Sequence, residues 1–324
     1  MKCINKAIAL IIPAAVLLSG CGNEIVTDYD IYSTSYQYGL LADSSDETAD
    51  FFAEDLCVTD ENNIESSPSE YVAEAAAVFN GATKEIKYAK NLHERMYPAS
   101  TTKIMTAYCA LKYGNLDQKI TVSNYAVKQS SDSSTADLKA GDVLTLRQLL
   151  YGMMLPSGND AAIAIAEGIS GSVEEFVSLM NSEAAKLGAT NTHFVNPNGL
   201  HDEDHYTTVY DMYLMFNEAV KDDTFLEIIG TEEYAAYYTS ASGSTVEQTW
   251  KTSNLFVVQE TATAKPEGVT VVGGKTGTTN PAGYCLVLLS RNESDEPIIS
   301  IVYKADCRLN VYFFQREIIK NFAN

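Results

Sequence analysis

The sequence predicts an α/β fold of the α+β kind, in which an antiparallel sheet formed by both chain ends is flanked by helices and stands beside an all-helical lobe. Three observations predict it. β-rich runs lie at residues 75–89, further β-rich runs lie at 269–303, and helical patterns fill much of the chain between them. Residues 71–324 suffice for one large domain or two closely packed lobes, with a cleft where sheet and lobe meet.

Two short β-rich runs open this body. Residues 75–79 and 85–89 flank Asn80 and Gly81, a dipeptide typical of tight turns. The pattern predicts a β-hairpin whose second strand runs toward Ser100.

Helical spacing begins beyond Pro98. Apolar side chains recur up to Gly114, a residue that suits a helix end; they are Ile104, Ala107, Tyr108 and Leu111. The spacing places Ser100 at the N-terminus of a helix.

The middle of the chain predicts four more helices. One is indicated by Leu146, Leu149, Leu150 and Met153 and breaks at Pro156. The next begins near Ala161 and is apolar nearly all round, which is typical of a buried helix. A third spans 172–187 and ends at Gly188. Thr208 and Asp211 resemble a capping box that opens a fourth.

The last part of the body returns to β-rich sequence. Residues 269–274, 284–290 and 298–303 predict strands separated by short polar turns. An amphipathic helix is expected over about 311–322, where it closes the domain.

Residues 1–21 are typical of a bacterial lipoprotein signal peptide. Lys2 and Lys6 precede an apolar run over 7–18, which is too short to span a membrane. The run ends in Leu-Ser-Gly-Cys, which resembles a lipobox, so we expect cleavage before Cys21 and a lipid on its thiol. That lipid would hold the protein on the outer face of the plasma membrane. The alternative is an ordinary signal peptide with an incidental cysteine.

Residues 22–70 predict an acidic flexible tether. The segment holds thirteen Asp or Glu residues and neither Lys nor Arg, so it repels itself and buries little. Fully extended, it would reach on the order of 150 Å. The alternative, which can hold together with the tether, is that residues 51–58 pack on the body. The formal net charge of −21 argues against a nucleic-acid partner.

The cysteines of the mature chain beyond Cys21 are few and scattered. Cys57, Cys109, Cys285 and Cys307 fit neither a disulfide scaffold nor a zinc cluster. We expect them to be core or adventitious thiols, and we expect neither a metal nor a cofactor.

Three short segments carry candidate chemistry. The first is Ser-Thr-Thr-Lys at 100–103. Residues three apart on a helix share a face, so the Lys103 amine can reach the Ser100 hydroxyl and act as its base. A helix start also offers free N–H groups for an oxyanion. Taken alone, the pair is better explained as a helix-capping serine beside a solvated lysine.

Two further segments carry polar residues that could form one site with this pair. Ser157 and Asn159 stand in a turn between two apolar helices, either pointing into a shared polar site or bonding their own backbone. Lys275 follows a β-rich run, where neighbouring glycines permit close backbone approach. The ordinary structural interpretation of Lys275 is a lysine that keeps an edge strand from pairing with another chain. Each ordinary interpretation explains its own segment, but together they leave unexplained why all three segments occur in one chain.

Together these segments resemble the serine D-Ala-D-Ala carboxypeptidases, the low-molecular-mass penicillin-binding proteins with a β-lactamase/transpeptidase-like fold. The resemblance covers nearly all of residues 74–306 and rests on four stretches: PASTTKIMTA, LPSGNDAA, FVNPNGLHDEDHYTT and GGKTGTTNPAG. It implies a peptidoglycan stem peptide ending in D-Ala-D-Ala as substrate and β-lactam antibiotics as covalent inhibitors. The chain stops soon after its last helix, so we expect the C-terminal β-rich domain of many family members to be absent.

The resemblance also implies the roles of the reacting groups. Ser100 would attack the penultimate D-Ala carbonyl, with Lys103 as its general base. Ser157 and Lys275 would relay the proton toward the leaving amine.

Further residues of these segments would bind the substrate by the same resemblance. Asn159 would hold its amide side. Thr276 and Thr278 would hold its terminal carboxylate, with Gly277 between them. The backbone N–H groups of Ser100 and Thr278 would form the oxyanion hole.

Several alternatives stay open. A class A β-lactamase would need an acid after the middle motif, where the chain has THFVNPNG. A D,D-endopeptidase would use the same groups on cross-linked wall. His201 and His205 suggest a zinc peptidase, although neither HExxH nor ExxH is present. A lipoprotein that only binds penicillin or wall peptides is the non-enzymatic alternative.

Overall fold

The computed structural model describes residues 53–130, 133–259 and 264–324. The predicted signal peptide, Cys21 and the predicted tether up to residue 52 lie outside the described residues. No helix in the described ranges is both long and apolar enough to cross a membrane.

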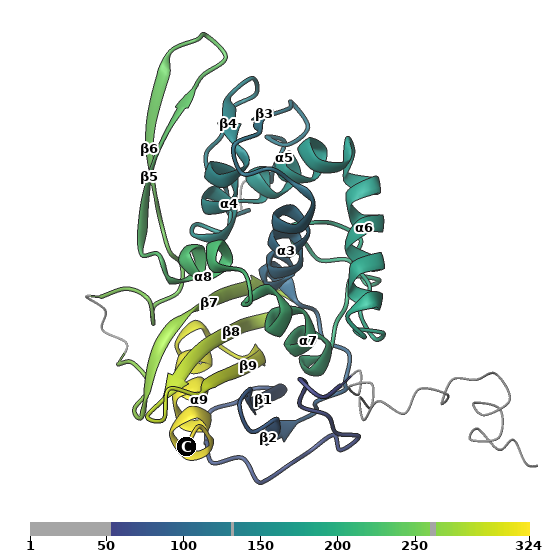
Figure 1. Cartoon of the computed structure of the whole chain (residues 1–324), viewed down its shortest axis with the longest axis vertical. Helices are drawn as coiled ribbons and strands as arrows, with labels where there is room; N and C mark the ends of the chain where they lie inside the picture. Colours follow the sequence, from purple (N-terminus) through teal and green to yellow (C-terminus); the bar gives the residue numbers. More distant parts are fainter. Residues whose placement is uncertain (1–52, 131–132, 260–263) are drawn as a thin grey trace, which may run out of the picture. The chain divides into compact units, whose positions relative to one another are not determined.

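The central element is a five-stranded antiparallel sheet that both ends of the body build (Figure 1). Its order is β2-β1-β9-β8-β7, so the first strands join the last ones through the β1–β9 pair. The strands are β1 (Ala75–Asn80), β2 (Glu85–Lys90), β7 (Val269–Thr279), β8 (Gly283–Asn292) and β9 (Pro297–Ala305). The predicted fold class and its hairpin are confirmed.

One face of this sheet is covered by the final helix, α9 (Arg308–Phe322), as Figure 1 shows. Its apolar side packs on a cluster that includes Val78, Leu288 and Val302. These residues alternate along their strands with others that face the opposite side, because successive strand residues point to opposite faces. The predicted closing helix is therefore confirmed, and it begins three residues earlier than expected.

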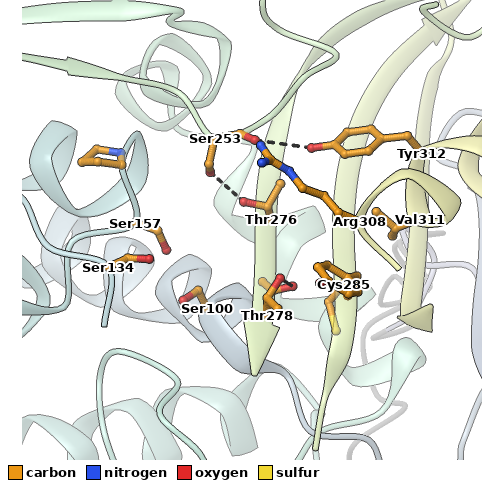
Figure 2. A pocket seen from close by; sticks show the side chains of 13 residues that line it. Ser100, Ser134, Ser157, Ser253, Thr276, Thr278, Cys285, Arg308, Val311 and Tyr312 are labelled. Carbon is orange, nitrogen blue, oxygen red and sulfur yellow. Dashed lines mark hydrogen bonds between the residues drawn. The ribbon is translucent and has the colours of Figure 1, made fainter. Parts of the chain in front are cut away.

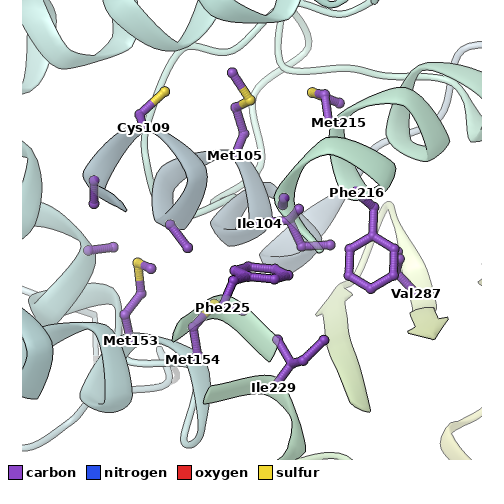
Figure 3. Packing of buried hydrophobic residues seen from close by; sticks show 14 of the residues in the cluster. Ile104, Met105, Cys109, Met153, Met154, Met215, Phe216, Phe225, Ile229 and Val287 are labelled. Atoms are coloured by element: carbon purple, nitrogen blue, oxygen red, sulfur yellow. The ribbon is translucent and has the colours of Figure 1, made fainter. Parts of the chain in front are cut away.

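The opposite face of the sheet carries the helices of the second lobe. They are α3 (Lys103–Tyr113), α4 (Leu146–Met154), α5 (Asn159–Ser170), α6 (Val173–Lys186), α7 (Val209–Ala219) and α8 (Asp223–Gly230). Helix α3 lies at the centre, where Ile104, Met105 and Cys109 are fully buried. Figure 3 shows side chains of α4, α7 and α8 gathered with those of α3. The helix that carries Lys103 is thus fixed by packing on several sides.

The start of α7 differs from a full capping box. The Thr208 hydroxyl accepts the Asp211 N–H at 3.0 Å, as predicted. The Asp211 carboxylate instead accepts the Asn191 N–H and the Thr192 hydroxyl, both at 2.8 Å. It therefore anchors the preceding loop rather than the helix start.

The lobe also contains a four-stranded antiparallel sheet, so an all-helical lobe is too simple. Its order is β3-β4-β5-β6. Its strands are β3 (Lys119–Thr121), β4 (Val143–Thr145), β5 (Glu233–Thr239) and β6 (Thr245–Lys251). Two of them hold three residues each, which is too short for a periodic pattern. The longer pair forms a hairpin that rises beside α4 (Figure 1).

Residues 56–64 pack on the body, which agrees with the alternative that the end of the acidic segment does so. The Cys57 N–H donates to the Tyr213 hydroxyl and its carbonyl accepts from Tyr210, both at 3.0 Å. Ile64 pairs with Ala89 of β2. Cys57, Cys109 and Cys285 are buried free thiols and Cys307 is exposed.

Glu183 on α6 is a heavily bonded carboxylate of this lobe, and it yields a stability prediction. Lys112 and Lys186 each approach it to 2.6 Å, and the Tyr113 hydroxyl donates at 2.7 Å. Burial alone would raise the pKa of Glu183, but these bonds lower it to about 2. Its stabilising effect should therefore be complete above the unfolded pKa of 4.5 and disappear as the pH falls toward 2.

We expect Glu183→Gln to lower the free energy of unfolding at pH 7 by about 1–3 kcal/mol, because charged partners lose their carboxylate. Urea unfolding at several pH values measures this, and the difference from wild type should shrink in acid. Glu174→Gln, an exposed change on the same helix, serves as control. Equal urea midpoints for wild type and Glu183→Gln at pH 7 would contradict the prediction.

Candidate active site

The three predicted segments meet at one pocket between the sheet and the helical lobe. Ser100 lies in the short 3-10 helix η1 (Ala99–Thr102), which leads directly into α3. The pocket is lined by Ser100, Ser157 and residues 276–278, among others. Figure 2 shows the Ser100 and Ser157 side chains facing Thr276 and Thr278 across it.

The Lys103 amine of the first segment contacts three polar groups. It lies 3.0 Å from the Ser100 hydroxyl oxygen. It also donates to the Asn159 side-chain oxygen at 2.7 Å and to the Asn198 carbonyl at 2.6 Å. Both of these oxygens can only accept. A neutral amine has two N–H donors and one lone pair, so its lone pair is then left for the Ser100 hydroxyl proton.

The electrostatics of the pocket favour that neutral state. Lys103 is completely buried. Burial, and then the nearby Lys275 cation, hold the pKa of Lys103 well below its usual range, although Asp160 opposes them. Burial is the larger of the two influences that lower this pKa.

Ser157 and Asn159 come from the turn between α4 and α5. Ser157 has φ +66°, a left-handed backbone conformation that is uncommon for a residue with a side chain. Its hydroxyl accepts from the Lys275 amine at 3.0 Å. The backbone is closely packed at this turn. A Cβ on Gly158 would lie only 2.6 Å from the Gly152 carbonyl oxygen.

Lys275 stands on β7 with 1% of its surface exposed. Besides Ser157, it donates to the Thr276 carbonyl at 2.8 Å. Burial lowers the pKa of Lys275 to about 7. A buried ammonium that lacks a carboxylate in contact is costly, so an anionic ligand in this pocket would favour its charged form.

The edge strand β7 lies directly against the Ser100 segment. A Cβ on Gly277 would stand 3.0 Å from the Ser100 nitrogen and 3.0 Å from the Pro98 carbonyl oxygen. Glycine at this position therefore permits the close approach. The neighbouring Thr276 hydroxyl lies 2.7 Å from Ser253, and the Thr278 hydroxyl donates to the Gly277 carbonyl at 2.8 Å.

A second pocket adjoins the first at Ser100. Asn159, Asn198, Leu200 and His201 line one side of it, and residues 278–281 line the other. The two pockets share Ser100, Ser134 and Thr278. The Ser100 side chain therefore stands where the two pockets join.

The sequence interpretation missed several lining residues. Arg308 and Tyr312 reach the first pocket from α9, and Ser253 reaches it from the segment after β6 (Figure 2). Ser134 lines both pockets. None of these residues belongs to a recognisable motif, because each is brought there by the packing of a distant element.

The histidines of the HDEDH stretch have structural partners. His205 is buried, its Nδ1 accepts the Val195 N–H at 3.1 Å, and its Nε2 lies 2.8 Å from the Thr102 hydroxyl. Burial lowers the pKa of His205 to about 4. His201 meets the edge of the Tyr97 ring. Within the described ranges, no group of three or more His, Cys, Asp or Glu side chains is placed to hold a metal ion.

An antiparallel sheet flanked by helices, with a Ser-x-x-Lys pair facing Ser-Gly-Asn and Lys-Thr-Gly segments, defines a class. It is the class of the penicillin-binding proteins and the serine β-lactamases.

Comparisons with known proteins identify the family within this class. The sequence profile of the D-alanyl-D-alanine carboxypeptidase family matches residues 61–307. The chain therefore belongs to the D-alanyl-D-alanine carboxypeptidase family of serine peptidases.

Individual relatives agree. The D-alanyl-D-alanine carboxypeptidase DacF of Bacillus subtilis is 37% identical over 72% of this chain and 57% of its own length. The D-alanyl-D-alanine carboxypeptidase of Streptomyces strain K15 is 38% identical over 64% of this chain and 72% of its own. This chain thus spans little more than half of the Bacillus relative.

A solved structure shows the same fold. The crystal structure of the Streptomyces K15 DD-transpeptidase superposes with a TM-score of 0.70 at 32% identity, covering 78% of this chain and 97% of that one.

Proposed function

We propose that the protein is a serine-type D-Ala-D-Ala carboxypeptidase that removes the last D-Ala from peptidoglycan stem peptides. One observation carries the proposal. Two serine–lysine pairs, Ser100 with Lys103 and Ser157 with Lys275, face one pocket, each with 3.0 Å between hydroxyl oxygen and amine nitrogen.

Acylation would begin at Ser100. Its hydroxyl oxygen attacks the carbonyl carbon of the penultimate D-Ala while its proton passes to the Lys103 lone pair. The carbonyl oxygen becomes an oxyanion, which the backbone N–H groups of Ser100 and Thr278 would bind. The closeness of β7 to η1 at Gly277 supports this placement.

The tetrahedral intermediate would then expel D-Ala. The C–N bond breaks, and the leaving nitrogen takes a proton through the Ser157 hydroxyl, which the Lys275 amine replenishes. An ester on Ser100 remains. Water then attacks that ester and gives one proton through Ser157 to the Lys275 amine, which restores its ammonium form. The C–O bond to Ser100 breaks as Lys103 returns its proton to the Ser100 oxygen, and the shortened peptide leaves as a carboxylate after losing the second proton of the water to solvent.

Substrate recognition would divide between the two pockets. The terminal carboxylate would lie in the first pocket, near Lys275, Thr276 and Thr278, with the Arg308 side chain at its edge. The amide side of the peptide would lie in the second pocket beside Asn159, whose N–H groups are not engaged by Lys103.

β-Lactams would acylate the same serine, since they present a strained amide carbonyl beside a carboxylate. Rapid drug hydrolysis through a glutamate-activated water is less well supported. In the THFVNPNG stretch the group that meets Lys103 is a backbone carbonyl, that of Asn198. A D,D-endopeptidase activity on cross-linked wall would use the same steps with a larger leaving amine.

We propose further that the protein works outside the cytoplasm, on the outer face of the plasma membrane. The signal pattern that ends at Cys21, the acidic segment after it and a cell-wall substrate support a lipid-anchored enzyme.

The purified domain should release D-Ala from diacetyl-Lys-D-Ala-D-Ala and bind one fluorescent penicillin covalently. Ser100→Ala should abolish labelling and lower kcat/KM by at least about 10³-fold, because the nucleophile is gone. Intact-mass analysis and D-Ala release measure both. Ser182→Ala, an exposed change on α6, is the matched control. Labelling that survives in Ser100→Ala would refute the nucleophile, and wild-type protein that releases no D-Ala would refute the activity.

The rate of acylation should depend on pH through both lysines. It should fall in acid as Lys103 takes up a proton, and fall above about pH 7 as Lys275 loses the charge that binds a carboxylate. Lys275→Arg keeps a cation at all these pH values, so its slower acylation should lack the alkaline decline. The second-order rate constant for penicillin acylation between about pH 5 and 10 tests this. An alkaline decline of equal size in both proteins would count against Lys275.

Cys21→Ser should prevent lipidation and leave the full-length protein outside the membrane fraction of a bacterial host. Detergent phase separation and the mass of the mature N-terminus measure this. Cys307→Ser, a change of the exposed thiol, controls for loss of a cysteine. Equal partitioning of wild type and Cys21→Ser would contradict lipid anchoring.

A further inference from the structure

The backbone of a single residue, Ala136, lies between the β5–β6 hairpin and the turn that carries Ser157 and Asn159. Its carbonyl accepts two hydrogen bonds from side chains of β6. Gln248 donates at 2.7 Å and the Trp250 indole at 3.0 Å. Ala136 is 1% exposed. Its buried carbonyl therefore depends on these two side chains, and not on solvent, for its hydrogen bonds.

The N–H of the same residue is bonded to the first turn of α5. The Ala136 N–H donates to the Asp160 carboxylate at 2.8 Å, and the Leu138 N–H donates to its second oxygen at 3.0 Å. One residue earlier on α5, the Asn159 N–H donates to the Ser134 carbonyl at 2.9 Å. The 134–138 segment is thus bonded to the helix start that presents Asn159.

The hairpin also packs against the helix that leads into Ser157. A Cβ on Gly152 of α4 would lie 3.2 Å from both the Trp250 ring and Ala136. After the hairpin, the Ser253 N–H donates to the Leu155 carbonyl at 2.9 Å, two residues before Ser157. The hairpin therefore braces both ends of the turn.

The bonding groups on the hairpin are themselves fixed. The Gln248 side-chain oxygen accepts from the Tyr238 hydroxyl at 2.8 Å, which turns its N–H groups toward Ala136. Trp250 lies parallel to Tyr234, and Tyr234 stacks on Tyr151 of α4. Neither Gln248 nor Trp250 lines the two pockets of the cleft.

We propose that Gln248 and Trp250 are positioning residues that set Ser157 and Asn159 for acylation through the backbone of Ala136 and the Asp160 carboxylate. The proposal rests on the proposed function, since it assigns these two residues a task in that reaction. The physical reason is that the reaction tolerates only small displacements of the groups that take part in it. Proton relay and amide binding need atoms held to a few tenths of an ångström, and a displacement of about 1 Å can cost on the order of 100-fold in rate.

Each donor can be removed with little change in shape. Trp250→Phe keeps an aromatic ring and loses the indole N–H, whereas Gln248→Met keeps the length and loses the amide. The control is Tyr237→Phe on the same hairpin, an exposed residue whose hydroxyl bonds only Glu247. The single variants and the double variant are compared with wild type at a temperature well below each thermal midpoint.

Stopped-flow acylation by a fluorescent penicillin separates the two possible roles. Loss of folded molecules lowers the amplitude of the acylation phase and leaves its rate constant unchanged. Misplacement of Ser157 and Asn159 lowers the rate constant at saturating penicillin. We expect each single variant to acylate about three- to tenfold more slowly and the double variant more than tenfold more slowly, with the control at the wild-type rate.

The outcomes are distinguishable. Slow acylation at full amplitude in the variants supports the proposal. A wild-type rate constant in both single variants overturns it and leaves the carboxypeptidase proposal standing, even where the double variant fails to fold. Wild-type protein that is not acylated at all overturns both.

Discussion

The structure of this cleft depends on burying two lysines side by side. Lys103 is fully buried and Lys275 nearly so, and the contacts of both are hydroxyl, amide and carbonyl groups. Two ammonium groups in so dry a place repel one another and lack counterions in contact. The cost is lowest when one amine is neutral. Burial and repulsion thus favour a neutral Lys103 amine, which is the state that its proposed role as the base for Ser100 requires.

The rest of the fold holds that arrangement together. Helix α3 is surrounded by other helices, so the Lys103 amine cannot turn to solvent. The strand β7 is pressed against η1 at Gly277, and the small second sheet braces the Ser157 turn through Ala136. A side chain that prefers water stays inside only where its surroundings leave no other low-energy position. Ser157 has a left-handed backbone conformation. Such a strained conformation persists only where the surrounding hydrogen bonds and packing determine it.

Most of the main sheet and the helices could be predicted from the sequence, because their apolar periods span several turns or strand pairs. The three motifs were likewise visible in the chain. The second sheet was not. Its strands β3 and β4 are only three residues long. Its strands β5 and β6 form a local hairpin but bury only one or two side chains each, so their apolar pattern is weak. Nor could the sequence reveal Arg308, Ser134 or the Asn198 carbonyl at the site. A carbonyl carries no residue identity, and the positions of the other two follow from how α9 and the 134–138 segment pack.

The shape of the cleft also bears on what happens after D-Ala leaves. In the proposed reaction the acyl chain on Ser100 would occupy the second pocket, and departure of D-Ala would empty the first. Arg308 lines that first pocket, and Lys275 lies behind its lining residue Ser157, 3.0 Å from the Ser157 hydroxyl. An amine that carries a carboxylate on its adjacent carbon would bind there in the same pose as the departed D-Ala. Water gains nothing from those cations. Acylation and transfer to such an amine therefore share one set of contacts, whereas hydrolysis depends on how readily water reaches the ester. In the proposed enzyme, water is always abundant, so hydrolysis of the ester would prevail unless such an acceptor is bound in this pocket.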